Sequence, residues 1–197
     1  MAAERAQAQT RILMMCGSLR RESLNRKLMN AATKLAPPEC ICTESVGVGD
    51  IPHLSEDVAR AAQPAAVKHF SDQIEVADAF IIVAPEYGHG MPGIVKNAID
   101  WVGCPQPMPN PLRFKPVALM GASVGNFGTM RCQLQLRQVL LFHECYVMPK
   151  PEIYVSRAQE RFDVRGNLID QPTVDLIKDF WASLLKFITM TRRVPLV

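Results

Sequence analysis

The stretch Ala79-Phe80-Ile81-Ile82-Val83-Ala84 is apolar at every position and is closed by Pro85. A strand that is apolar on both of its alternations has both faces covered, which is typical of a central strand in a parallel sheet. A second apolar run, over residues 11–16, stops at Gly17 and predicts a buried first strand. Together the two runs predict a parallel sheet at the centre of the fold.

Elsewhere in the chain, helical spacing of apolar residues alternates with short apolar runs. The helical spacing predicts helices over residues 24–35, 67–77, 94–102, 130–143 and 177–188. Further strands are predicted over 41–48, over 117–120 and near Tyr146, whereas residues 149–172 are expected to form a polar excursion rich in turns. Strand and helix alternate five times, which predicts an α/β doubly wound sheet of five parallel strands with helices on both faces.

The domain organisation predicted from the sequence is simple. A length of 197 residues suits one core. No linker, internal repeat or low-complexity tract interrupts the pattern. We therefore expect a flexible N-terminal tail over residues 1–10, a single domain over residues 11–190, and a C-terminal tail over residues 191–197.

The composition excludes several classes of protein. The net charge is +3, and no run of Lys and Arg is interleaved with aromatic residues, so no nucleic-acid partner is expected. No apolar stretch approaches the ~20 residues of a membrane span, and the N-terminus lacks the apolar core of a signal peptide. The six cysteines form no C-x-x-C pair, and no metal site is expected. Cys40 and Cys42 alternate along a predicted strand and are expected to pack on one face. A cytoplasmic location follows.

Ligands of doubly wound sheets bind beyond the carboxyl ends of the strands, so the loops leaving the strands carry the function. The first loop (residues 17–26) holds a single glycine and no G-K-[ST] triplet, so it is neither a dinucleotide fingerprint nor a nucleotide P-loop. It presents two hydroxyls, an amide and a guanidinium where a helix begins, from Ser18, Ser23, Asn25 and Arg20. A helix start attracts anions, and the loop therefore predicts a phosphate site. The alternative is that Ser23 merely caps the helix and the arginines are solvated.

Three segments in this order resemble a known family. The first loop resembles the G-S-x-R-x-x-S-x-N-R stretch of the NADPH-dependent FMN reductase family. The second loop (residues 85–93), continued by residues 96–101, resembles its P-E-Y-N-x-x-x-P-G-x-x-K-N-A-I-D-W segment, with Gly88 where asparagine is frequent. The third loop (residues 121–128) resembles its G-A-S-x-G-x-x-G loop. The resemblance covers nearly everything from Arg11 to about Leu185.

The resemblance implies a flavodoxin-like fold that binds FMN. The first loop would hold the FMN phosphate, with Ser18, Arg20, Ser23, Leu24 and Asn25. The second loop would lie against the isoalloxazine ring, with Pro85, Glu86, Tyr87, Gly88 and His89, and its glycines would allow close backbone approach. Ser123 and Gly125 of the third loop would line the other edge of the ring. No catalytic side chain is expected, because flavin hydride transfer needs none.

Three residues near the second loop have simpler interpretations. His89 is better explained as an exposed loop histidine than as an acid or base. Lys96 and Asp100 stand four residues apart and can pair on a helix surface. Trp101 is a packing residue, within a subunit or between subunits.

The resemblance also implies an activity. NADPH, or NADH, would give hydride to FMN, and the reduced flavin would then reduce a small-molecule acceptor such as a quinone, free flavin, an azo compound or a metal oxyanion, with ping-pong kinetics. A homodimer or homotetramer is expected from the family. Two alternatives stay open. One is a flavodoxin-type electron carrier, although such carriers are usually strongly acidic. The other is a cofactor-free redox or interaction protein on the same fold.

Overall fold

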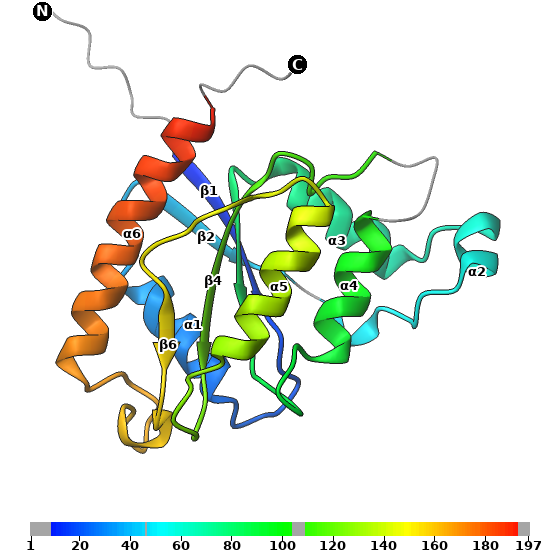
Figure 1. The fold of residues 1–197 in the computed structure, drawn as a ribbon. Helices are drawn as coiled ribbons and strands as arrows, with labels where there is room; N and C mark the ends of the chain where they lie inside the picture. The colour runs from blue at the N-terminus through cyan, green and yellow to red at the C-terminus, as the bar shows by residue number, and fades with distance from the viewer. Residues whose placement is uncertain (1–8, 46, 104–108, 193–197) are drawn as a thin grey trace, which may run out of the picture.

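The computed structural model describes residues 9–45, 47–103 and 109–192. Its strands form one sheet in the order β2-β1-β3-β4-β5, in which every pairing is parallel and β6 also pairs with β4 (Figure 1). This order is that of flavodoxin-like doubly wound sheets, so the predicted fold class is confirmed. The strands are β1 (Thr10–Cys16), β2 (Cys40–Glu44), β3 (Ala79–Val83), β4 (Pro116–Ala122), β5 (Tyr146–Val147) and β6 (Ile153–Val155).

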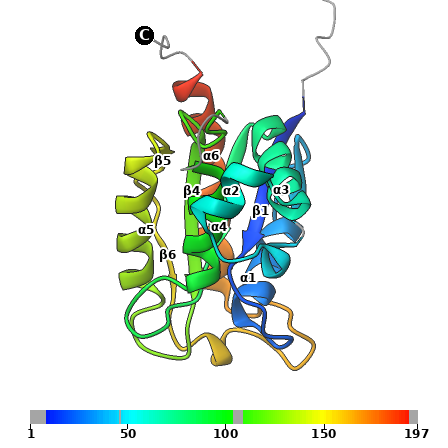
Figure 2. The same cartoon turned by 90° about the vertical axis from the view of Figure 1, so that its right-hand side faces the viewer.

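Helices cover both faces of the sheet, as predicted (Figures 1 and 2). Alternate residues of β1 explain the two layers, because Met14 belongs to one buried cluster and Leu13 to the other. One face carries α1 (Leu24–Lys34) and α6 (Gln171–Thr191), and the other carries α3 (Ala65–Val76), α4 (Gly93–Gly103) and α5 (Met130–Phe142). Three short helical segments complete the described elements: η1 (Val48–Asp50), α2 (Glu56–Ala61) and η2 (Ala158–Glu160).

Two short strands fill the fifth position of the sheet. β5 pairs with the first residues of β4, and β6 pairs with its last residues, Met120–Ala122. The expectation of an irregular excursion over residues 149–172 is therefore wrong at β6. Ile153 and Val155 are buried in the core, but three residues among polar neighbours are too short to show a strand period.

Several predicted boundaries also shift. β1 begins at Thr10, inside the expected tail, because Thr10 N donates to Glu39 O at 2.8 Å. β2 ends at Glu44 rather than at residue 48, and Gly47, with a φ of 72°, precedes η1. Helix α6 continues to Thr191. Parts of both expected tails lie outside the described residues, namely residues 1–8 and 193–197. The same holds for residues 104–108, in the proline-rich segment before β4.

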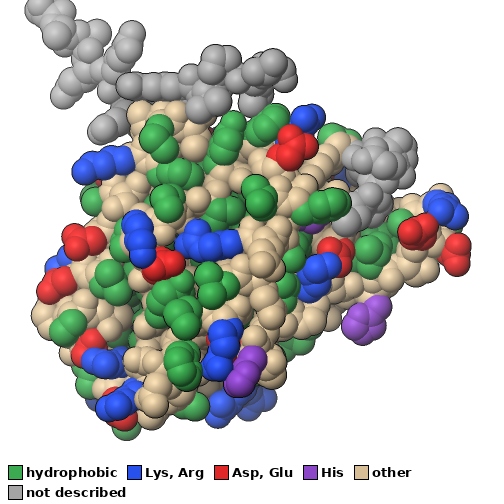
Figure 3. All heavy atoms as spheres, viewed as in Figure 1, with side chains coloured by type: hydrophobic (Ala, Val, Ile, Leu, Met, Phe, Trp, Pro, Cys, Tyr) green, Lys and Arg blue, Asp and Glu red, His purple; other side chains and the backbone are tan. Residues whose placement is uncertain are grey.

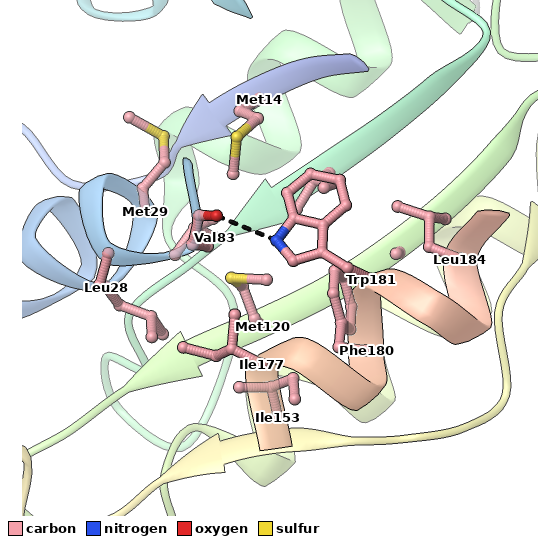
Figure 4. Close-up of a cluster of buried hydrophobic side chains, with 14 of the residues drawn as sticks. Met14, Leu28, Met29, Val83, Met120, Ile153, Ile177, Phe180, Trp181 and Leu184 are labelled. Carbon is pink, nitrogen blue, oxygen red and sulfur yellow. Dashed lines mark hydrogen bonds between the residues drawn. The ribbon is translucent and has the colours of Figure 1, made fainter. Parts of the chain in front are cut away.

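Trp181 of α6 lies at the centre of the core between that helix and the sheet (Figure 4). Its side chain is 1% exposed, and its indole N–H donates to Ala32 O of α1 at 2.9 Å. The ring also packs edge-to-face on Phe180, with centroids 6.0 Å apart. Trp181 therefore anchors helix α6 to helix α1. Cys40 and Cys42 pack against the same cluster, as predicted.

The surface is chemically mixed. On the face drawn in Figure 3, Lys and Arg side chains are interspersed with Asp and Glu. Among the described helices, none combines the length and the apolar character needed to cross a bilayer.

Candidate functional site

The three strand-end loops converge on one crevice at the carboxyl edge of the sheet, a cavity of about 150 Å³ that residues of all three loops line. The first loop contributes Ser18, Arg20, Ser23, Leu24 and Asn25. The second loop contributes Pro85, Glu86 and Tyr87, and the third loop contributes Ser123. Residues that lie far apart in the sequence are thus brought together as predicted. Ala122 and Val124, which flank Ser123 but were not among the predicted site residues, also line the crevice.

Gly88, His89 and Gly125 do not line this cavity. Gly125 lies beside it, because its N–H donates to Ser123 Oγ at 3.1 Å. His89 is exposed at the tip of the second loop, in agreement with its interpretation as a loop histidine. The sequence therefore predicted the centre of the crevice better than its outer margin.

The first loop contains a helix-capping serine, Ser23, and an exposed arginine, Arg20. Ser23 Oγ accepts from Arg26 N at 3.3 Å and caps α1, and the residue also lines the crevice. Arg26 pairs with Glu44. Arg20 is exposed on the crevice wall and forms no ion pair with any residue that the structure describes. The helix start and this guanidinium make the local field favourable to an anion.

Gly17 allows the first loop to lie directly against α4 and the end of β3. A Cβ at this position would be 2.5 Å from Val95 Cγ2 and 3.3 Å from Ala84 Cα. Real Cβ atoms do not approach other atoms as closely as 2.5 Å. The single glycine of this loop is thus required by packing beneath the crevice.

The second loop is a tight β-hairpin. Tyr87 N donates to Gly90 O at 3.0 Å, and Gly90 N donates to Tyr87 O at 2.9 Å. The two central residues, Gly88 and His89, have φ values of 55° and 62°. A two-residue turn with positive φ at both positions is of type I′, which favours Gly and Asn. Gly88 therefore replaces the family's asparagine with a residue suited to the same backbone conformation.

The side chain of Glu86 binds the start of helix α5. Its carboxylate is 7% exposed and accepts from Arg131 Nε at 2.6 Å. It also accepts from the main-chain N–H groups of Arg131 at 3.0 Å and Cys132 at 3.3 Å, in the first turn of α5. Tyr87, by contrast, is 57% exposed. Sequence reasoning did not single out Arg131, because nothing in the sequence shows that α5 starts beside the second loop.

Asn25 ties the first loop to the third. Its Nδ2 donates to Ala122 O at 2.9 Å, and its Oδ1 accepts from Ala122 N at 2.9 Å. β3 pairs with β4 only as far as Met120, so the Asn25 amide binds the main chain of β4 beyond the end of its neighbouring strand. The side chain is buried and positions the two loops relative to each other.

Cys16 at the end of β1 and Cys132 in α5 are buried free thiols that do not line the crevice. Burial raises the pKa of the Cys16 thiol at the end of β1 and raises that of Cys132 to about 12. Both thiols therefore stay protonated at neutral pH. The described residues contain no group of three or more His, Cys, Asp or Glu side chains that could hold a metal ion. This arrangement can bind and orient a ligand.

The neighbours of the second loop behave as predicted. Lys96 Nζ lies 2.6 Å from an Asp100 carboxylate oxygen, four residues along α4. Trp101 is 1% exposed, and its indole N–H donates to Pro52 O at 2.7 Å, so it packs within the subunit.

A larger cavity, of about 350 Å³, lies at the opposite edge of the sheet, near Lys115 and Tyr146. Its basic side chains already have partners: Arg192 pairs with Asp78, Arg113 pairs with Glu144, and Lys115 donates to the main-chain oxygens of Glu75 and Ala77. Ligands of doubly wound sheets bind at the carboxyl edge. The smaller crevice is therefore the candidate functional site.

A parallel sheet in the order 2-1-3-4-5, with one crevice lined by the loops that follow β1, β3 and β4, defines a protein of the flavodoxin-like fold. Comparisons with known proteins agree. A family model described as NADPH-dependent FMN reductase matches residues 10–160. The chain belongs to this family.

The relatives are similar over most of their length. An NAD(P)H-dependent FMN reductase of Pseudomonas aeruginosa is 41% identical over 168 residues, which cover 85% of this chain and 89% of the relative. A quinone reductase of Escherichia coli is 38% identical over 167 residues, 83% of this chain and 87% of the relative. The solved structure of FerB, a flavoenzyme NAD(P)H:(acceptor) oxidoreductase from Paracoccus denitrificans, has a TM-score of 0.85 at 34% identity and covers 92% of this chain and 98% of its own.

The family assignment confirms the enzyme predicted from the sequence: an FMN-dependent oxidoreductase that uses NAD(P)H. It favours this enzyme over the electron carrier and the cofactor-free protein, which were the two alternatives.

Proposed function

We propose that this protein holds FMN in the crevice, takes hydride from NADPH or NADH, and reduces small acceptors such as quinones, free flavin, azo compounds or metal oxyanions. The observation that carries the proposal is the convergence of Arg20, Tyr87 and Ser123, from three separate loops, on one cavity. The residues present fit such a ligand, because an anion-attracting helix start adjoins two loops that can flank a flat ring.

The phosphate would lie at the start of α1. Unpaired main-chain N–H groups at a helix start bind phosphate, and the Arg20 guanidinium adds a planar set of donors. Ser18 and Ser23 supply hydroxyls at the same wall. Leu24 and Asn25 would contribute main-chain contacts, because the amide of Asn25 is already bonded to Ala122.

The ring would lie toward the outer margin, between the second and third loops. The crevice of about 150 Å³ is smaller than the roughly 300–1,000 Å³ of pockets that enclose most of a drug-sized ligand. It therefore suits a ligand of which one part stays accessible, against Gly88, His89 and Gly125. When bound, FMN supplies the hydride chemistry, and the protein supplies position and electrostatics.

Apolar side chains are exposed on all three strand-end loops. Leu19, Tyr87, Val124 and Phe127 belong to these loops and are all more than half exposed, and Tyr87 and Val124 line the crevice. Exposed apolar side chains beside a site favour planar acceptors with aromatic or quinonoid rings. The names of the relatives, quinone reductase and FMN reductase, support the same class of acceptor.

We also propose a homodimer or homotetramer in the cytoplasm. Leu134, Leu141 and Phe142 leave an apolar strip exposed on α5, which supports contact with a second copy. Trp101 is buried within the subunit and offers no surface for such a contact. The described cysteines are free thiols, which suits a reducing compartment.

Replacing Arg20 with alanine tests the phosphate assignment. We expect Arg20→Ala to raise the Kd for FMN about tenfold, because a charge-assisted hydrogen bond contributes ~1.5 kcal/mol. The Kd is measured by quenching of FMN fluorescence on titration with apoprotein. Arg21→Ala is the matched control, since Arg21 is exposed in the same loop but does not line the crevice. Equal weakening by both variants, or by neither, would contradict the assignment.

A further inference from the structure

Helix α5 lacks a cap from its own sequence. Its N-cap residue, Thr129, has a left-handed φ of 73° and makes no side-chain capping bond. The first helical residue, Met130, donates its N–H to Phe127 O at 2.9 Å. The next two N–H groups, those of Arg131 and Cys132, need a partner from elsewhere, because the first turn of a helix has none within the helix.

Glu86 supplies that partner from the second loop. One carboxylate oxygen accepts from both N–H groups, at 3.0 and 3.3 Å, and the other accepts from Arg131 Nε at 2.6 Å. The negative charge also lies at the positive end of the helix dipole, where it is stabilised. Arg131 is held further by Phe127, whose ring centroid is 4.5 Å from the guanidinium carbon. A residue 45 positions earlier in the chain therefore caps α5.

The cap lies between two crevice residues. Pro85 and Tyr87, on either side of Glu86, line the cavity. A second bond, from Met91 N to Gln135 Oε1 at 3.0 Å, joins the other end of the same hairpin to α5. The hairpin thus cannot shift toward or away from the crevice without breaking bonds to the first turns of α5.

We propose that Glu86 is a positioning residue that couples the second loop to helix α5, so that order in the first turn of that helix and retention of FMN depend on each other. The inference rests on the proposed FMN site. Coupling of this kind is reciprocal: if an ordered first turn strengthens FMN binding, then bound FMN must order the first turn by the same factor.

Two measurements on Glu86→Gln test the proposal. Glutamine keeps one acceptor oxygen but loses the charge and places an NH₂ group against Arg131. We expect the Kd for FMN to rise about tenfold, because a charged cap and a partly buried ion pair are lost together. In the apoprotein, we expect amide hydrogen exchange at Arg131 and Cys132 to become about tenfold faster. Glu144→Gln is the control, because it removes another Glu–Arg Nε pair, 3.0 Å from Arg113, which is more exposed and lies at the opposite edge of the sheet.

A third measurement needs no variant. In the wild-type protein, FMN should slow exchange in the first turn of α5 by about threefold or more and leave its last turn unchanged. If Glu86→Gln does not fold, this comparison of wild-type exchange with and without FMN is the test of the coupling between FMN and α5.

The outcomes separate the two proposals. Faster exchange together with weaker FMN binding, absent in Glu144→Gln, supports the positioning role. Faster exchange in Glu86→Gln with an unchanged Kd for FMN would show that Glu86 is a local cap only, and would overturn the positioning role. Exchange in the first turn of α5 that is the same in the wild type with and without FMN would also overturn it. Failure of the wild-type protein itself to bind FMN would instead overturn the proposed function, and the coupling with it.

Discussion

Asn25→Ala is expected to lower the free energy of unfolding by about 2–4 kcal/mol and to abolish tight FMN binding, since two buried main-chain groups lose their partner. Asn25 is 3% exposed, and its amide satisfies both the N–H and the C=O of Ala122. Alanine would leave both groups unpaired at the end of β4. The first and third loops would then no longer be held at a fixed distance across the crevice.

Urea unfolding of the apoprotein and titration with FMN measure the two effects. Asn30→Ala is the matched control, because Asn30 lies on the same helix but is exposed. It should change the free energy of unfolding by no more than about 0.5 kcal/mol. A variant at Asn25 that is as stable as the Asn30 variant and binds FMN as well would contradict the role assigned to this amide.

Trp181→Ala should cost about 3–5 kcal/mol of the free energy of unfolding, the usual range for removing a buried tryptophan. The ring is 1% exposed among the residues of Figure 4, and its N–H is bonded to Ala32 O at 2.9 Å. The loss combines a cavity in the core with an unpaired carbonyl oxygen in α1. Since α1 carries the proposed phosphate site, FMN binding should weaken as well.

Thermal and urea unfolding measure this loss. Trp181→Phe keeps much of the packing and should be intermediate between wild type and Trp181→Ala. Met190→Ala, on the exposed face of the same helix, should change the free energy by less than about 1 kcal/mol. If Trp181→Ala were no more destabilising than Met190→Ala, the tie between α6 and α1 would not be important for stability.

Much of the fold was predictable because its signals are local. The run 79–84 is apolar on both alternations, and β3 within it is fully buried between two helix layers. β6 could not be predicted, since Ile153–Val155 owes its strand conformation to pairing with β4, which lies far away in the sequence. β2 ends at Glu44, before the left-handed Gly47, whereas hydrophobicity alone suggested a strand up to residue 48.

The members of the site were easier to predict than their roles. Each loop was found because it follows a strand, and a parallel sheet brings the ends of its strands to one edge. The roles of Asn25 and Glu86 depend on which elements become neighbours across the crevice. Their bonds to Ala122 and to α5 span 97 and 45 positions in the chain, so no local pattern could reveal them.

The central claim is that the crevice binds FMN and that NADPH reduces it there. The most direct measurement is the visible absorption spectrum of the protein reconstituted with FMN and freed of excess flavin, recorded before and after anaerobic addition of NADPH. The account predicts a flavin band that stays with the protein, bleaches with NADPH or NADH, and returns when a quinone is added. A protein that retains no flavin band, or one whose band neither nucleotide bleaches, would contradict it.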